Sequence, residues 1–193
     1  MQFLNIAALL AAAASAVVAE NKIIFKSIDD VNRTVYFTAN AGLEEVKSVE
    51  VPAGSTVNVT IPHGWIGNYY SVCEGKPNKP GMLGEVAFNG WNDLTYFDVS
   101  AIVDPSDHEG VAEMWPAKGC KPTSGCQLFP CANAYYLWDD VQTKVTHETE
   151  LVTTLGKTGY DIKKGEKIRG ADENGSFEGY TVYKRSYVEG KWF

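Results

Sequence analysis

Residues 46–62 read VKSVEVPAGSTVNVTIP and carry the clearest fold signal in the chain. Apolar and polar residues alternate on both sides of the turn residues 52–55, as they do in half-buried strands. A Pro-Gly turn between two such runs indicates a β-hairpin. In the second run Val57 and Val59 share one face, and Asn58 takes the other.

Similar alternating segments recur outward from this stretch, and helical periodicity is poor almost throughout. The chain contains 18 glycines and many β-branched and aromatic residues. We therefore predict an all-β fold, an antiparallel β-sandwich with a short disulfide-bearing loop region. A short helix is expected at 132–141. The expected strands are 22–26, 34–38, 47–51, 56–61, 69–73, 82–88 and 95–103.

The 193 residues suffice for one domain with a sizeable core. An apolar run of about a dozen residues near the start is too short to span a bilayer. Small residues then precede Glu20, which predicts a signal peptide at 1–19. Residues 20–193 are expected to form one secreted domain, extracellular or in the cell wall, monomeric and without a membrane span. From about residue 147 the sequence is polar and rich in Gly and Lys. This composition predicts an atypical C-terminal extension with an aromatic strand near 180–187.

The net charge is −7, from 17 basic and 24 acidic residues. There is no basic stripe, which argues against tight binding to nucleic acid. No nuclease motif surrounds His63, His108 or His147. A nuclease nevertheless stays open as an alternative, because a bound metal can support one in an acidic protein. No cofactor is expected.

Four cysteines in an oxidising compartment favour two disulfides. Three pairings are possible, and the sequence does not choose among them. A bond from Cys73 to the later cysteines is favoured over a reactive thiol, and the spacing matches no common zinc pattern. The predicted disulfide residues are Cys73, Cys120, Cys126 and Cys131.

Three Asn-x-Ser/Thr sequons fit a glycosylated surface of a secreted protein. The predicted glycosylation sites are Asn32, Asn58 and Asn174.

The segment 94–110, LTYFDVSAIVDPSDHEG, is dense in titratable groups. Its alternation turns Asp98 away from Phe97. In the preceding run Glu85 is turned away from Val86 in the same way. We therefore expect Glu85 and Asp98 on one polar face of one sheet.

Paired carboxyl groups can hydrolyse a glycosidic bond when one acts as acid and the other as base or nucleophile. We assign the acid to Glu85 and the base to Asp98 or Asp104. The alternatives are an acidic cleft that contacts carbohydrate without reaction, or a solvated polar face. The acids of 104–109 could bind calcium. Pro105 favours a capped turn instead, so no metal site is predicted.

Three stretches resemble the thaumatin-like protein family. They are VEVPAGSTVNVTIPHGWIGNYYSVC at 49–73, GMLGEVAFNGWNDLTYFDVSAIVD at 81–104 and CANAYYLWDDVQT at 131–143. The matching positions are Gly64, Trp65, Gly67, Cys73, Leu83, Glu85, Phe88, Asn89, Gly90, Phe97, Asp98, Val99, Ser100, Val103 and Asp104.

The resemblance implies a sandwich of two antiparallel sheets beside an acidic cleft, binding of β-1,3-glucan and sometimes weak endo-glucanase activity. Carried over, the cleft acids are Glu85, Asp98 and Asp104, with a later acid from Asp139 or Asp140. The departures are an Asn in place of the family's cleft Arg and far fewer cysteines. Exposed aromatic side chains could stack on sugar rings. The predicted ligand-binding residues are Asn68, Tyr70, Trp91, Trp115, Asp139 and Asp140.

The function predicted from the sequence is thus a secreted thaumatin-like protein whose acidic cleft binds cell-wall or extracellular polysaccharide. The alternatives are a secreted hydrolase, either a weak glucanase or a nuclease, and a non-catalytic effector or inhibitor that binds a partner protein.

Overall fold

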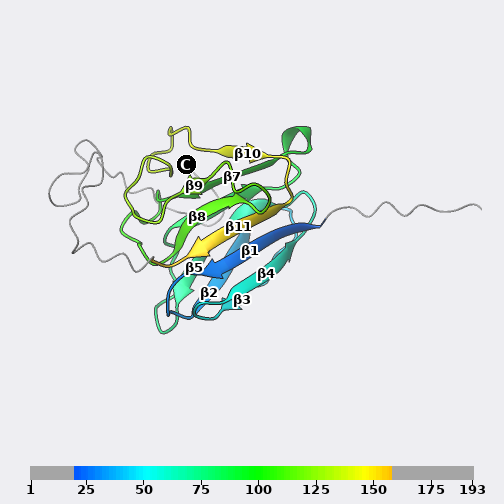
Figure 1. Ribbon diagram of the computed structural model, residues 1–193. Coiled ribbons are helices and arrows are strands. Elements are labelled where there is room, and N and C mark those ends of the chain that lie inside the picture. Colours follow the sequence, from blue (N-terminus) through cyan, green and yellow to red (C-terminus); the bar gives the residue numbers. More distant parts are fainter. Residues whose placement is uncertain (1–19, 158–193) are drawn as a thin grey trace, which may run out of the picture.

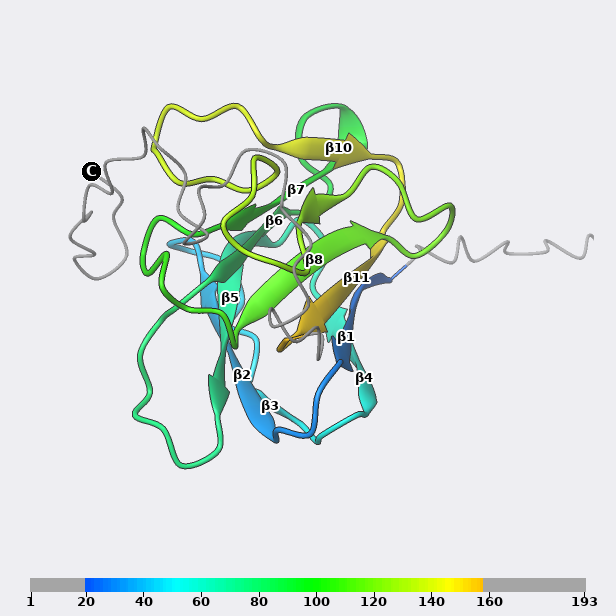
Figure 2. The ribbon, with the colours of Figure 1, turned by 60° about the vertical axis from the view of Figure 1, so that its left-hand side comes forward.

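The computed structural model describes residues 20–157, which form two stacked β-sheets (Figures 1 and 2). Sheet A has the strand order β4-β1-β11-β8-β9, and sheet B has the order β10-β7-β6-β5-β2-β3. Neighbouring strands are antiparallel except β1 and β11, which are parallel. The predicted all-β, mainly antiparallel sandwich is confirmed.

The strands are β1 (Asn21–Ser27), β2 (Arg33–Ala39), β3 (Val49–Val51), β4 (Thr56–Ile61), β5 (Ile66–Cys73), β6 (Leu83–Ala87), β7 (Thr95–Ser100), β8 (Val111–Pro116), β9 (Ser124–Gly125), β10 (Lys144–Thr146) and β11 (Glu150–Leu155). A 3-10 turn, η1 (Trp91–Asp93), is the one helical segment in residues 20–157. That part of the chain therefore has no helix able to cross a membrane.

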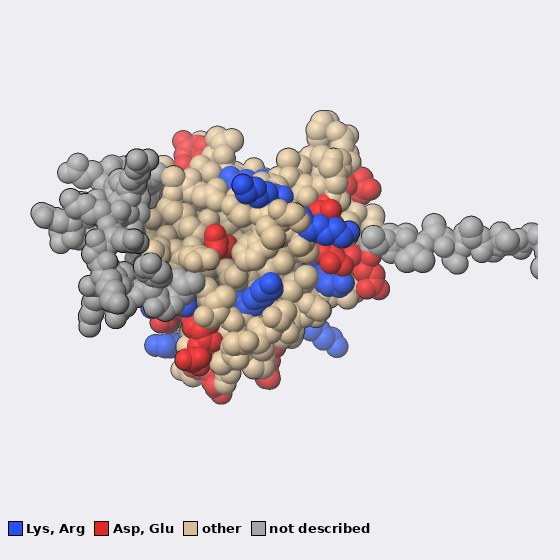
Figure 3. All heavy atoms as spheres, viewed as in Figure 1, with Lys and Arg blue, Asp and Glu red and all other residues tan. Residues whose placement is uncertain are grey.

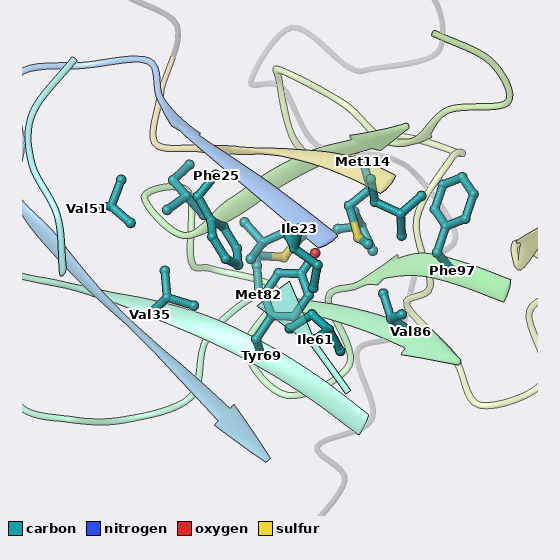
Figure 4. Packing of buried hydrophobic residues seen from close by; sticks show 14 of the residues in the cluster. Ile23, Phe25, Val35, Val51, Ile61, Tyr69, Met82, Val86, Phe97 and Met114 are labelled. Carbon is teal, nitrogen blue, oxygen red and sulfur yellow. The ribbon is translucent and has the colours of Figure 1, made fainter. Parts of the chain in front are cut away.

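The core lies between the sheets, where alternate residues of each strand meet. Figure 4 shows Ile23 and Phe25 of β1 pointing toward Tyr69 and Val86 of sheet B. The rings of Phe25 and Tyr69 meet edge to face at 5.1 Å, a favoured aromatic geometry. A Cβ at Gly84 would lie 2.4 Å from the Tyr69 ring, so this close approach requires glycine. Alternation in the sequence thus reports the buried faces correctly.

The hairpin predicted around residues 52–55 is wrong, although both of its strands exist. β3 pairs with β2 in sheet B, whereas β4 pairs with β1 in sheet A. The turn between them crosses from one sheet to the other. Its backbone is held by the 28–32 connection, because Gly54 N–H donates to the Asp29 carbonyl and Ala53 N–H to Asn32 Oδ1. The sequence pattern marks each strand but not its partner.

An ion pair between buried Arg33 and half-buried Asp29 fixes this crossing. The Arg33 guanidinium donates from Nη1 and Nη2 to the two carboxylate oxygens of Asp29, at 2.5 and 2.6 Å. Its Nε donates to the Glu109 carbonyl at 2.9 Å, and the Lys157 N–H donates to Asp29. Burial alone would raise the pKa of Asp29, but the hydrogen bonds from Arg33 and Lys157 outweigh it and hold that pKa below its usual value.

The predicted C-terminal extension begins too early. Residues 150–155 form β11, which lies in the middle of sheet A between β1 and β8. Leu151, Thr153 and Leu155 are fully buried on its inner face. Polar residues flank β11 on both sides, so its alternation is not recognised as a strand. The same holds for β8 and β10. Three further predictions lie outside the described residues: the signal peptide at 1–19, the glycosylation site at Asn174 and the strand near 180–187.

The helix predicted at 132–141 is also absent. The segment is a loop that runs along the edge of β7, where Tyr135 forms an isolated bridge with Ser100. Asp140 Oδ2 accepts the backbone N–H groups of Tyr136 and Leu137 at 2.8 and 2.9 Å. These side-chain bonds stabilise a turn at the expense of a helix.

One of the two expected disulfides is present, between Cys126 and Cys131. Cys73 and Cys120 are free thiols, so the favoured bond from Cys73 to the later cysteines is wrong. Cys73 ends β5, where its Sγ lies 3.9 Å from Glu109 Oε2. Burial raises the pKa of the Cys73 thiol, which disfavours the reactive thiolate at neutral pH.

Leu151→Ala tests whether β11 belongs to the core. Leu151 is fully buried, so the truncation should lower the free energy of unfolding by about 2–5 kcal/mol. Urea unfolding followed by tryptophan fluorescence measures the change. Val145→Ala on the exposed side of β10 serves as control and should cost far less. Equal effects of the two exchanges would show that β11 is not a core strand.

Asp29→Asn tests the ion pair at the crossing. The exchange leaves the Arg33 charge buried without its counter-ion, which should cost about 3 kcal/mol of stability. Asp30→Asn, at the exposed neighbouring position, should change stability little. A shared midpoint of urea denaturation for both variants would contradict the role given to Asp29.

Candidate functional site

A row of polar side chains crosses the outer face of sheet B. The strand register places Thr38 opposite Asn68, Asn68 opposite Glu85, and Glu85 opposite Asp98. We call these four residues the polar row. Three of them, from Asn68 to Asp98, line an open hollow of about 220 Å³ together with Ile66 and Tyr96. The sequence-based placement of Glu85 and Asp98 on one face is thus what the register produces.

Asp98 is the most constrained member of the row, with 8% of its surface exposed. Thr143 Oγ1 donates to Asp98 Oδ2 at 3.3 Å. Tyr135 OH lies 2.8 Å from the same Thr143 hydroxyl and can donate to it. The other oxygen, Asp98 Oδ1, is buried and has no donor among the described residues when both carboxyl groups are ionised.

The Glu85 carboxyl group faces Asp98 and changes its acidity. Burial, the negative charge of Glu85 and a hydrogen bond with Glu85 raise the pKa of Asp98 to about 8. A hydrogen bond between two carboxyl groups needs a proton on one of them, because ionised carboxylates are acceptors only. Between the usual carboxyl range and about pH 8 the pair therefore holds one proton, which the Glu85–Asp98 hydrogen bond shares.

Aromatic and apolar side chains border the polar row on both sides. Tyr36 and Tyr70 stack with ring centres 5.6 Å apart, and the Tyr70 hydroxyl donates to Asn78 Oδ1 at 3.0 Å. Tyr70 lies two residues after Asn68 on β5 and so shares its face. On the other side are Ile66 and Tyr96, which line the hollow itself. The polar row thus lies between apolar side chains on both sides.

Asp104, the third predicted acid, lies elsewhere. Its Oδ1 accepts the backbone N–H and the hydroxyl of Ser106, which makes it the cap of a turn. It lines a different hollow, together with His108 and Glu109. A cleft shared by all three predicted acids is therefore not formed. Residues 20–157 contain no group of three side chains arranged to hold a metal ion.

The remaining predicted ligand-binding residues are dispersed. Trp91 is 77% exposed in η1, which the Tyr96 hydroxyl ties to β7 through the Trp91 carbonyl. Trp115 belongs to β8 and lies in the other sheet, opposite Val152. Asp139 is exposed on the 137–141 loop, and Asp140 caps that loop. Asn68 and Tyr70 are the two that the fold brings to the Glu85–Asp98 pair.

Sequence reasoning missed the residues that surround this pair from a distance. Thr143 and Tyr135 come from the loop mistaken for a helix, and Tyr36 from β2 carries no motif. Only the alternation of 34–38 gave a signal, since it puts Tyr36 on the outer face. No local pattern reports that a loop about forty residues downstream returns to Asp98.

Comparison with known proteins gives the chain a family. No family model matches it. The antigenic protein SchS21 of Stachybotrys chartarum is 53% identical over 134 residues, which cover 69% of this chain and 93% of that protein. The chain belongs to the SchS21 family. The crystal structure of the protein elicitor MoHrip2 from Magnaporthe oryzae is 15% identical with a TM-score of 0.52, over 70% of this chain and 98% of that one. At this identity the similarity supports the sandwich fold alone.

Membership of the SchS21 family corrects the thaumatin-like resemblance, which is wrong. The relative and the structure described above are an antigenic protein and an elicitor, and no family model matches. Packing accounts for several of the shared residues. Phe97 and Val99 fill the core, and a Cβ at Gly67 would lie 2.7 Å from the Trp65 ring. These shared residues therefore report packing in a β-sandwich and not a thaumatin-like function.

Asp98→Asn tests the shared proton. Because the folded-state pKa of Asp98 is raised from about 3.8 to about 8, its contribution to stability is full below pH 4 and is lost as pH rises to about 8. The amide can donate to Glu85 at every pH. The variant should therefore gain little relative to wild type at pH 4 and progressively more as the pH rises, by up to about 5 kcal/mol at pH 8.

Urea denaturation at a series of pH values measures this difference. Glu50→Gln, on the exposed edge of the same sheet, is the control and should leave the slope with pH unchanged. A wild-type stability that does not fall between pH 4 and 8 relative to Asp98→Asn would exclude a protonated Asp98.

Proposed function

We propose that this member of the SchS21 family is secreted and binds a neutral extracellular polysaccharide on the outer face of sheet B. The observation that carries the proposal is the Glu85–Asp98 pair with its single proton, placed beside Asn68 in an open hollow. The predicted signal peptide supports secretion, and the names of the SchS21 antigen and the MoHrip2 elicitor are in keeping with an extracellular protein.

The polar row matches the chemistry of sugar hydroxyl groups, which donate and accept hydrogen bonds at the same oxygen. A carboxyl pair with one proton offers one donor and several acceptor positions, and the Asn68 amide adds both kinds. The stacked Tyr36 and Tyr70 rings present apolar faces at the border, suited to the apolar side of a pyranose. A chain of sugars could thus lie across the strands, from the tyrosines to the carboxyl pair.

The geometry favours binding over hydrolysis. Glycosidases hold their two carboxyl groups on either side of the scissile bond, roughly 5–9.5 Å apart. Glu85 and Asp98 are instead cross-strand neighbours whose carboxyl groups bond to each other. No sugar oxygen fits between two groups that share a proton, so the acid and base roles assigned to them have no support in this arrangement.

Charge restricts the ligand to neutral polymers. Neither Lys nor Arg lines the hollow in the part of the chain that the structure describes, and the net charge of the protein is −7. An anionic polysaccharide or a nucleic acid would meet the Glu85 carboxylate, and Lys144, whose charge reaches Asp98, does not line the hollow. Neutral wall glucans, chitin and cellulose are therefore the polymers to test.

Retention on insoluble polysaccharides tests the proposal. The full-length secreted protein is incubated with β-1,3-glucan, chitin and cellulose in turn, and the unbound fraction is measured. Glu85→Gln and Tyr36→Ala should each weaken retention about tenfold, the equivalent of one hydrogen bond to a charged group or one stacked ring. Glu113→Gln, on the outward side of β8 in sheet A, is the matched control and should bind as wild type does.

Two results would overturn the proposal. The first is that no neutral polysaccharide retains the wild-type protein. The second is that Glu113→Gln lowers retention as much as Glu85→Gln, because the binding face would then not be that of sheet B.

A non-catalytic effector that binds a partner protein is the second candidate. The loop 137–141 favours it, because Trp138 and Val141 are 72% and 90% exposed there. Exposed apolar side chains of this size are typical of interaction sites. Cross-linking to extracellular proteins tests this candidate, since Trp138→Ser should lower capture of a partner protein whereas Glu85→Gln should not.

A further inference from the structure

The two sheets end in four edge strands of very different length. In sheet B the edges are β3 and β10, with three residues each, and in sheet A they are β9, with two, and β4, with six. Short edges offer few free backbone groups to another chain. β4 is thus the one long edge in residues 20–157, and it lies at the rim of the sandwich in both ribbon views (Figures 1 and 2).

β4 lacks the usual protection of an edge strand. Its sequence TVNVTI contains no charged residue and no proline, and it pairs with β1 over six consecutive residues without a bulge. Figure 3 shows the acidic side chains of this face gathered at its lower left and at its right, with Lys and Arg side chains between them. Such a straight, uncharged edge is a template for pairing with a further strand.

Asn58 occupies the middle of this strand and points outward. It is exposed, and its side chain makes no hydrogen bond with the described residues. Thr60, the hydroxyl residue of the sequon, is exposed on the same face. Asn32 differs, because its amide donates to Glu74 and accepts from the Ala53 N–H. Of these two sequons, Asn58 is the one whose amide nitrogen is available.

We propose that Asn58 carries an N-glycan and that this glycan blocks pairing of β4 with β4 of a second copy of the chain. In the transfer, Asn58 Nδ2 forms a bond to the anomeric carbon of a lipid-diphosphate oligosaccharide and loses a proton to base. The bond between sugar and phosphate breaks, and the lipid diphosphate leaves. The glycan would protect β4 from edge-to-edge pairing, as charged side chains protect other edge strands.

The geometry of a two-fold β4–β4 pairing shows why Asn58 is the effective position. Directly opposite residues in an antiparallel pair point to the same face. The registers with the greatest overlap therefore place Asn58 opposite Asn58 or Thr60 of the second copy. In the first register two glycans would leave the same face from Cβ atoms about 4.5–5.5 Å apart, and in the second from diagonal positions about 7–8 Å apart. A single glycan has room beside Ile24 of β1, but both registers crowd two bulky glycans together and so oppose the pairing.

The test uses the full-length protein from a secreting, glycosylating host. Peptide mass spectrometry should find a glycan on Asn58, and sedimentation velocity should find a monomer. Asn58→Gln and Thr60→Ala both remove the sequon, so each should self-associate with a dissociation constant at least about tenfold lower than wild type. Amides of β4 should gain protection from hydrogen exchange in the associated form.

Three control variants separate the glycan from the side chains. Thr60→Ser keeps the sequon and should stay glycosylated and monomeric. Asn32→Gln removes a different sequon and should not associate. Asn58→Lys lacks the glycan but places a charge on the edge, and it should also remain monomeric.

Any of three outcomes overturns the proposal. They are an unmodified Asn58, an Asn58→Gln or Thr60→Ala protein that stays as monomeric as wild type, and association that leaves β4 unprotected from exchange. Because two independent substitutions remove the glycan, misfolding of one of them does not decide the result. None of these measurements depends on the polysaccharide site in sheet B.

Discussion

The buried contact between Arg33 and Asp29 is the constraint on which the arrangement of the two sheets depends. The guanidinium lies where the chain first crosses from sheet A to sheet B, and its hydrogen bonds reach Asp29 and the Glu109 carbonyl. Asp29 also accepts the N–H of Lys157 just after β11, and its carbonyl accepts that of Gly54 in the second crossing. Four segments distant in sequence therefore meet at one ion pair. A buried charge is tolerated there because nearly every donor and acceptor around it is used.

With the crossings fixed, the register of sheet B makes the candidate site. Strands β5, β6 and β7 are consecutive antiparallel neighbours, so a polar residue at the same level in each produces an unbroken row. The same register sets two carboxyl groups against each other and buries one of them. This arrangement opposes stability, because Asp98 must keep a proton that the unfolded chain would release. A destabilising pair at the centre of a well-packed sheet is the kind of local conflict that marks a functional surface.

The sequence predicted what local alternation encodes and little of what distant contacts decide. It located β4 at its correct bounds and turned Glu85 and Asp98 to one face, because the direction of a side chain in a strand depends only on its position. It failed for the hairpin, since the course of the turn depends on the Asp29 carbonyl and the Asn32 side chain, which accept the backbone N–H groups of Gly54 and Ala53. It failed for Asp104, because the sequence does not distinguish an aspartate that caps a turn through Ser106 from an aspartate that lines a cleft. The free Cys73 and the central position of β11 likewise follow from spatial neighbours that no motif records.

The position of the polar row on central strands has a consequence for recognition. Backbone groups of β5, β6 and β7 are paired on both sides, so the row is held rigid before any ligand arrives and little ordering cost accompanies binding. The shared proton reduces the charge of the pair from two to one below about pH 8, so less hydration of charged groups has to be given up when a neutral sugar binds. A carboxylate pair in water would lose its proton at that pH and stay strongly hydrated. Burial of Asp98 therefore both destabilises the fold and makes the surface suitable for a neutral, hydroxyl-rich ligand.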